Sequence, residues 1–80
     1  MSRAAIRMPN LGAEATMGRI TAWVRGVGDT VAVGDVIAEL ETEKATVEFE
    51  SPIAGRIAEI AQPAGVGVRI GEVLAILEVD

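Results

Sequence analysis

Eighty residues with a net charge of -5 suffice for one small domain and leave no room for an enzyme core with a separate substrate site. The chain has no cysteine and no histidine, which excludes disulfides, thiol chemistry, and the commonest general base and metal ligand. The negative charge argues against nucleic acid or an anionic membrane as a partner, because both bind positive surfaces.

Short predicted strands, separated by turn residues, follow one another along the chain. Half of the residues are hydrophobic and mostly aliphatic, with Trp23 and Phe49 as the only aromatics, a composition that favours strands. The predicted strands are 3–7, 17–25, 36–42, 46–50, 54–61 and 72–79, with minor strands near 30 and 68. The segment NLGAEAT, residues 10–16, has no strand pattern and predicts a surface loop. No segment shows a sustained helical period.

An internal repeat relates the two halves of the chain. When the sequence is shifted by 37 positions, residues 18–41 lie over residues 55–78 without a gap, and ten of the 24 pairs are identical. Three of the identical pairs are glycines: Gly18/Gly55, Gly28/Gly65 and Gly34/Gly71. Glycine marks turns that need a positive φ or a close backbone approach. We therefore expect matched turns and a flattened all-β sandwich or barrel of eight strands in two related halves.

The repeat also predicts where Lys44, the only lysine in the chain, lies. The offset carries Lys44 to Arg7 near the chain start and to a point just past Asp80. The chain ends are therefore the expected counterparts of Lys44. A pseudo-twofold axis would place the Lys44 segment at one end of the molecule and both termini at the other.

The segment ELETEKATVEFES, residues 39–51, has the pattern of a β-hairpin with Glu43 and Lys44 as its two loop residues. The expected inward pairs are Thr42/Ala45, Leu40/Val47 and Ala38/Phe49, and the expected outward pairs are Glu41/Thr46 and Glu39/Glu48. A shift of one residue would bury glutamates, so the apolar face fixes the register. The loop lacks the Asn-Gly or Asp-Gly of a type I′ turn, so we expect a type I turn with Lys44 projecting from the tip.

Lys44 is predicted to be exposed and lacks the burial or cationic neighbours that activate catalytic lysines, so a Schiff-base role is not expected. A surface lysine that only caps a turn is the plain alternative. All other basic residues are arginines, however, and arginine is not acylated as an ε-amine is. A lone lysine on a hairpin tip therefore presents one unambiguous target for modification.

The segment ETEKATVE, with WVRGVGDTVAVGDVIAELE upstream and SPIAG downstream, resembles the lipoyl domain of 2-oxo acid dehydrogenase complexes over nearly the whole chain. The resemblance implies a flattened barrel of two four-stranded antiparallel sheets with internal pseudo-twofold symmetry, and lipoic acid in amide linkage on Lys44. Biotinyl domains share this fold but usually have Met on both sides of their lysine. This chain has Glu43 and Ala45 there, which favours lipoate over biotin. Glu43, where the family commonly has Asp, and Met17, where many relatives have Glu, are departures from the family pattern.

The resemblance also implies a carrier that is not an enzyme by itself, with no catalytic residue and no metal. A lipoyl ligase or transferase would modify Lys44, and Glu43 and Ala45 would form the shape that this enzyme recognises. The lipoyl arm would then visit a thiamin-diphosphate-dependent dehydrogenase (E1), the acyltransferase core (E2) and a flavin-dependent dihydrolipoamide dehydrogenase (E3). The loop Leu11–Thr16, which the resemblance places beside the hairpin, would help E1 to choose this domain.

Residues 1–80 are expected to form a single lipoyl domain, monomeric when isolated, and the N-terminal module of a longer acyltransferase chain. The start MSRAAIRMPN lacks the apolar core of a signal peptide, and no apolar run approaches the roughly 20 residues of a membrane span. We therefore expect a cytoplasmic protein, or one of the mitochondrial matrix if the source is eukaryotic. Two alternative functions stay open: a biotin carrier of a carboxylase, and an unmodified interaction module of the same fold. Trp23 and Phe49 are expected to be packing residues, and Asp29 and Asp35 turn residues.

Overall fold

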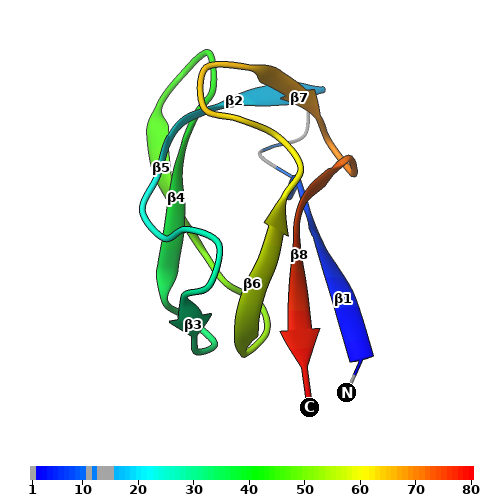
Figure 1. Cartoon of the computed structure of the whole chain (residues 1–80). Helices are drawn as coiled ribbons and strands as arrows, with labels where there is room; N and C mark the ends of the chain where they lie inside the picture. The colour runs from blue at the N-terminus through cyan, green and yellow to red at the C-terminus, as the bar shows by residue number, and fades with distance from the viewer. Residues whose placement is uncertain (1, 11, 13–15) are drawn as a thin grey trace.

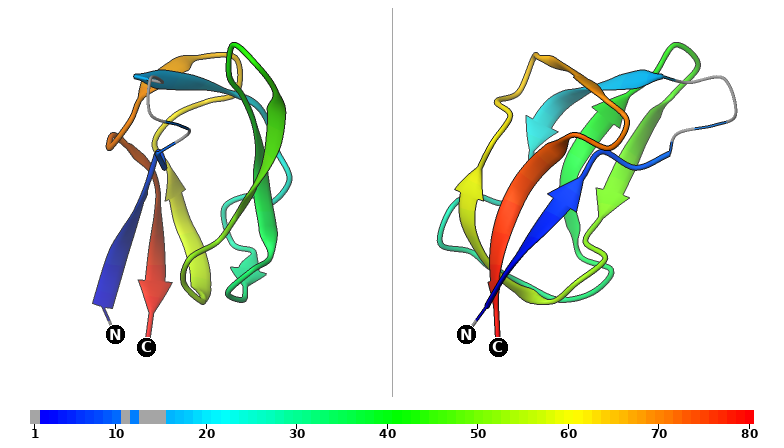
Figure 2. Two further views of the ribbon diagram at one scale, coloured as in Figure 1. Left: turned by 180° about the vertical axis from the view of Figure 1, so that it is seen from behind. Right: turned by 90° about the vertical axis from the view of Figure 1, so that its right-hand side faces the viewer.

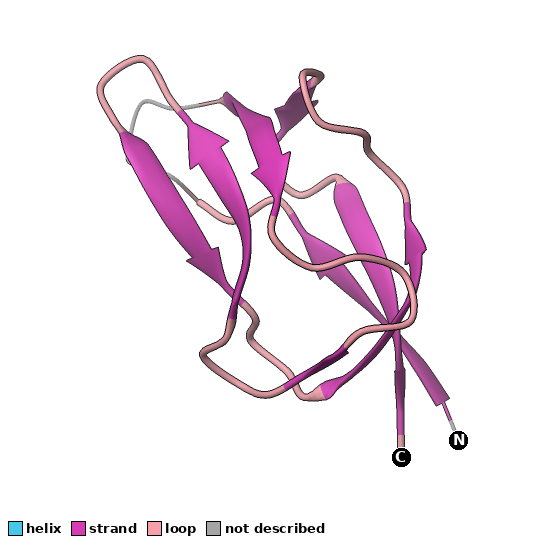
Figure 3. Ribbon diagram, turned by 60° about the vertical axis from the view of Figure 1, so that its left-hand side comes forward, coloured by secondary structure: helices cyan, strands magenta, loops and turns pink. Residues whose placement is uncertain are grey.

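Eight strands and no helix make up the part of the chain that the computed structural model describes, residues 2–10, 12 and 16–80 (Figure 3). In chain order the strands are β1 (Ser2–Arg7), β2 (Met17–Trp23), β3 (Thr30–Val31), β4 (Val36–Glu41), β5 (Thr46–Glu50), β6 (Gly55–Ile60), β7 (Gly67–Arg69) and β8 (Val73–Val79). Within these residues, no helix has the length and apolarity needed to cross a membrane.

All eight strands lie where the sequence predicts them, and the largest difference is at the end of β2. This strand ends at Trp23 and not at residue 25. The backbone N–H groups of Val24 and Arg25 both donate to the carbonyl oxygen of Ile37, at 2.9 and 3.3 Å. Two successive donors on one acceptor turn the chain out of the extended conformation, which ends the strand.

The strands form two four-stranded antiparallel sheets that face each other (Figure 1). The strand order is β1-β8-β6-β3 in one sheet and β5-β4-β2-β7 in the other. The strands β8, β6 and β3 are the counterparts of β4, β2 and β7 under the repeat, and they hold the same places in their sheet. The predicted pair of four-stranded sheets related by a pseudo-twofold axis is therefore confirmed.

The core between the sheets has the same symmetry. Ten of the twelve buried apolar residues in the described chain form five pairs related by the repeat: Ile20/Ile57, Val31/Val68, Ile37/Leu74, Ala38/Ala75 and Leu40/Leu77. The other two, Ile6 and Met8, lie in and just after β1. Each fully buried large aliphatic side chain stabilises the fold by about 1.5–3 kcal/mol relative to an exposed one. The two halves therefore make matched contributions to one core.

Glycines with positive φ occupy equivalent turns in the two halves. The φ angles are 96° at Gly28 and 91° at Gly65, and 91° at Gly34 and 89° at Gly71. Residues with a Cβ are strained in this left-handed region, whereas glycine is not. The matched turns predicted from these two glycine pairs are confirmed.

Two aspartates complete the turns of the first half, as predicted. The Asp29 carboxylate accepts a hydrogen bond from the N–H of Gly26, and the Asp35 carboxylate accepts one from the N–H of Ala32, both at 2.8 Å. Each bond closes a short loop between two consecutive strands that lie in different sheets, the use of Asp that is typical of turns.

The β4–β5 hairpin and the chain ends lie at opposite ends of the molecule, as predicted (Figure 1). β1 and β8 are antiparallel neighbours, with Ser2 opposite Val79. This terminal pair is the counterpart of the β4–β5 hairpin, because β1 and β5 are the edge strands beside β8 and β4.

The predicted correspondence between Lys44 and Arg7 is wrong. Arg7 lies at the end of β1 away from the terminus, and its Nη1 donates to the carbonyl oxygen of Gly71 at 2.8 Å. The offset of the repeat does not extend to β1, because the connection from β1 to β2, residues 8–16, is longer than the connection from β5 to β6, residues 51–54.

Candidate functional site

The β4–β5 hairpin carries Lys44 at its tip in the predicted register. The paired residues are Ala38/Phe49, Glu39/Glu48, Leu40/Val47 and Glu41/Thr46. The backbone N–H of Thr42 donates to the carbonyl oxygen of Ala45 at 2.8 Å. This bond closes the loop around Glu43 and Lys44, the two residues predicted to form it.

The inward face of the hairpin is buried only at its base. Ala38 and Leu40 are fully buried and Phe49 packs against the core, whereas Val47 is 39% exposed and Ala45 is exposed. The prediction of three inward apolar pairs is correct at the base and wrong near the tip. The reason is that the hairpin extends past β1 and β8 of the facing sheet, as Figure 2 shows.

Thr42 holds the backbone of the tip. Its Oγ1 accepts hydrogen bonds from the backbone N–H groups of Lys44 and Ala45, each at 3.2 Å. The hydroxyl also donates to the carbonyl oxygen of Ala45 at 3.2 Å. Threonine hydroxyls that bind the backbone two or three residues further on stabilise turns. From the sequence, Thr42 is assigned only to an inward pair, although a threonine directly before a two-residue loop is the signal for this arrangement.

The tip exposes its residues without backbone strain. Glu43, Lys44 and Ala45 are all exposed. No non-glycine residue in the described chain has a positive φ, which excludes a type I′ turn because that turn needs positive φ at both loop residues. The predicted absence of a type I′ turn is therefore confirmed.

Carboxylates surround Lys44 without pairing with it. The ion pairs within 4 Å in the described chain all involve arginine. Glu41 pairs with Arg19 of the neighbouring strand, while Glu39 and Glu48 face each other across the hairpin. The amine of Lys44 is thus exposed and outside any ion pair of the described residues, so an acylating enzyme meets no competing partner there.

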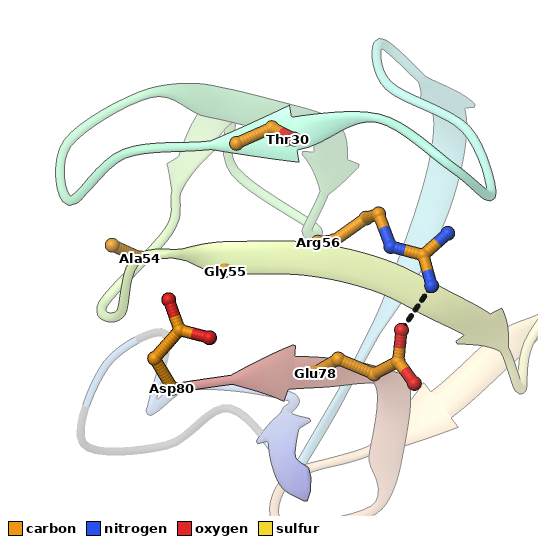
Figure 4. Close-up of a pocket in the computed structure, with 6 residues that line it drawn as sticks. All are labelled: Thr30, Ala54, Gly55, Arg56, Glu78 and Asp80. Carbon is orange, nitrogen blue, oxygen red and sulfur yellow. Dashed lines mark hydrogen bonds and ion pairs between the residues drawn. The ribbon is translucent and has the colours of Figure 1, made fainter. Parts of the chain in front are cut away.

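A hollow, called the terminal hollow below, lies beside β3, the start of β6 and the end of β8, at the end of the molecule that holds the termini (Figure 1 and Figure 4). Its lining residues are Thr30, Ala54, Gly55, Arg56, Glu78 and Asp80. The ion pair between Arg56 and Glu78 lies along it. In the parts of the chain that are described, no group of His, Cys, Asp and Glu side chains is arranged to hold a metal ion. The residues that line the terminal hollow lie at the end of the molecule opposite the lysine hairpin, so the two sites are separate.

Trp23 and Phe49 pack against the core, as predicted. Trp23 also donates a hydrogen bond from Nε1 to the carbonyl oxygen of Gln62 at 2.9 Å. Because Trp23 ends β2 in one sheet and Gln62 follows β6 in the other, this bond joins the two sheets. The loop Leu11–Thr16, predicted to help a dehydrogenase choose this domain, lies largely outside the described residues, so its role stays a prediction.

A family model described as "Biotin-requiring enzyme", which covers biotin- and lipoyl-attachment domains, matches residues 4–77. Among solved structures, the lipoyl domain of the 2-oxoglutarate dehydrogenase complex from Azotobacter vinelandii superimposes on this chain with a TM-score of 0.75. That match has 29% sequence identity and covers 94% of this chain and 95% of the other. The similarity therefore extends over the whole two-sheet fold.

Larger proteins contain segments similar to this chain. The chain is 43% identical over 72 residues to the dihydrolipoyllysine-residue acetyltransferase component of the pyruvate dehydrogenase complex of Corynebacterium glutamicum, covering 90% of this chain and 11% of that protein. It is 38% identical over 73 residues to the dihydrolipoyllysine-residue succinyltransferase component of the 2-oxoglutarate dehydrogenase complex of Bartonella vinsonii, covering 91% and 18% respectively. The chain thus spans less than a fifth of the length of either relative.

Proposed function

The chain belongs to the family of biotin- and lipoyl-attachment domains and is a lipoyl carrier domain, and from this premise we propose that Lys44 carries lipoic acid in amide linkage. The proposal rests on the position of Lys44 in the structure. The only lysine of the chain is exposed at the tip of a hairpin whose backbone is held by Thr42.

The lysine site fits a long acyl chain on the amine. Acylation turns the ammonium of Lys44 into a neutral amide, and no ion pair of the described residues within 4 Å is lost in the process. The neighbours Glu43 and Ala45 are exposed, so the tip is open to the active site of a modifying enzyme. We assign Glu43 and Ala45 to recognition by a lipoyl ligase or transferase, because they flank Lys44 on the same hydrogen-bonded turn.

The domain acts as a carrier and not as a catalyst. Lipoic acid supplies the redox and acyl-transfer chemistry when it is bound, and the domain supplies the position of the arm. The proposed partners are E1, the acyltransferase core of E2, and E3, since the similar proteins named above are components of pyruvate and 2-oxoglutarate dehydrogenase complexes. Tethering raises the effective concentration of the arm at each active site to about the millimolar range.

We also propose that this domain is the N-terminal module of a longer acyltransferase chain. Two features support a module: the similar segments form 11% and 18% of larger proteins, and the chain ends lie together at the end opposite the lysine. A linker joined at that end would leave the hairpin pointing outward toward the partner enzymes.

The experiment that tests the proposal is intact-protein mass spectrometry after incubation with lipoate, ATP and a lipoyl ligase. A parallel reaction contains biotin and a biotin ligase, because the matching family includes biotin-attachment domains. The Lys44→Arg variant is the control for the site. We expect a mass increase of one lipoyl group in the wild-type protein only. An increase of one biotinyl group would assign the domain to a carboxylase, and no increase with either ligase would favour an unmodified interaction module.

A further inference from the structure

The outer faces of the two sheets carry equivalent rows of residues. Each row crosses three neighbouring strands and contains one Arg–Glu ion pair. The rows are Thr30–Arg56–Glu78 in one sheet and Gly67–Arg19–Glu41 in the other. The first row lines the terminal hollow. The second lies beside the lysine hairpin, because Glu41 is the last residue of β4.

The two rows differ in the sizes of their side chains. Thr30 of the first row is replaced by Gly67 in the second, and Ala54 beside the first row is replaced by Met17 beside the second. A Cβ added to Gly67 would lie 2.9 Å from the Cε of Met17. The methionine therefore lies over the glycine and fills the place that is an open hollow at the terminal end.

Met17 is large, apolar and exposed at the same end of the molecule as the hairpin tip. Half of its surface, 50%, is open to solvent. The pairing of β2 with β4 ends at Arg19 and Glu41, and Met17, two residues before Arg19, pairs with Arg69 of β7. Figure 2 shows the start of β2 at the same end of the molecule as the tip of the β4–β5 hairpin, opposite the chain ends. An unbranched thioether is polarisable and adapts its shape to a small apolar group.

We propose that Met17, seated over Gly67, forms a resting surface for the dithiolane ring of the lipoyl group on Lys44. The inference rests on the proposed function. Two inter-strand spacings separate β4 from β7, about 10 Å in all, and the extended lysine stem with its acyl chain is longer than that. The ring is neutral, apolar and rich in sulfur, so contact with a methionine side chain removes apolar surface of both from water.

Val47 is the alternative contact surface for the dithiolane ring. It follows Lys44 on β5 and is 39% exposed, but it lies on the inward face of the hairpin and is β-branched. A β-branched side chain is stiff at χ1. Met17 combines greater exposure with a flexible stem, so it is the better partner for a ring that arrives on a flexible arm.

The test uses the whole domain labelled with carbon-13 in its three methionine methyl groups, before and after lipoylation verified by intact mass. Met8 is 2% exposed and serves as an internal reference. We expect the Met17 methyl signal to shift on lipoylation and to show nuclear Overhauser effects to the ring protons, while the Met8 signal stays in place. Met17→Ala should abolish the effects between ring and domain. This variant should fold, because alanine occupies the equivalent position 54.

Val33→Ala is the matched control, since Val33 is 67% exposed and its turn lies at the terminal end of the molecule. The effects between Met17 and the ring should persist in it. A lipoylated protein in which the Met17 signal does not shift, or in which the ring protons contact Val47 and not Met17, overturns the inference and leaves the carrier function intact. A protein that gains no lipoyl mass overturns the carrier function and the inference together.

Discussion

The hydroxyl oxygen of Thr42 lies 3.2 Å from the backbone nitrogen of Lys44 and accepts its N–H. The same oxygen accepts the N–H of Ala45 at 3.2 Å. One side chain thus fixes the backbone at the proposed attachment residue and at its neighbour. The position of the amine depends on a residue that takes no part in the modification itself.

Replacing Thr42 with valine should therefore lower both stability and the rate of modification. Valine keeps the shape of threonine but loses the hydroxyl, so we expect a loss of about 1 kcal/mol in the free energy of unfolding. A loosened tip should also slow lipoylation by a ligase. Thr46→Val is the control, because Thr46 makes no side-chain hydrogen bond within the described residues. Equal initial rates of lipoylation for the two variants would contradict the role given to Thr42.

Lys44→Arg should leave the fold unchanged. The side chain is exposed and forms no ion pair within 4 Å in the described chain, so we expect the free energy of unfolding to change by no more than about 0.5 kcal/mol. Urea denaturation followed by circular dichroism measures this. A clearly less stable variant would show that the lysine has a structural role that the hairpin geometry does not reveal.

Gly34→Ala should destabilise the domain although there is room for the new methyl group. A Cβ at Gly34 meets nothing within 4 Å, but its φ of 91° lies in the left-handed region. The expected loss is about 1–2 kcal/mol. Gly26→Ala is the matched control, with equally open space and no positive φ, and it should have little effect. Gly71→Ala, the counterpart of Gly34, should repeat the loss, and a difference between these two variants would argue against equivalent turns.

Gly55→Ala and Gly67→Ala should differ although both meet a close neighbour. A Cβ at Gly55 would lie 2.5 Å from the backbone carbonyl oxygen of Glu78, whereas at Gly67 it would lie 2.9 Å from the flexible end of Met17. A strand carbonyl cannot move aside, so Gly55→Ala should cost about 1–3 kcal/mol. Met17 can change rotamer, so Gly67→Ala should cost clearly less. Denaturant midpoints of the two variants decide the order.

The strands and the hairpin register could be predicted from the sequence because several local signals agree. The apolar residues Ala38, Leu40 and Phe49 alternate with glutamates, so one register alone keeps charge out of the core. The glycines at 28, 34, 65 and 71 recur at one offset, which marks the turns of both halves. Sequence spacing carries this information directly, since the side-chain period of a strand and the φ of a turn are local properties.

Other features depend on contacts that no local pattern encodes. The equivalence of Lys44 with Arg7 failed because the connection between β1 and β2 is longer than its counterpart, which only the strand pairing reveals. The exposure of Val47 depends on how far the hairpin extends past the facing sheet. The seat of Met17 over Gly67 depends on the pairing of β2 with β7, two strands far apart in the sequence.

The adjacency of the two chain ends has a mechanical consequence. Ser2 and Val79 face each other at the open end of an antiparallel pair, so a force that pulls the termini apart loads one residue pair of β1 and β8 at a time. Such loading unzips a ladder from its end, whereas sliding two strands past each other would load all of its bonds together. Opposite forces applied at the two chain ends would thus peel β1 from the edge of its sheet first. The lysine hairpin, in the other sheet and at the far end, would keep its shape while that strand came away.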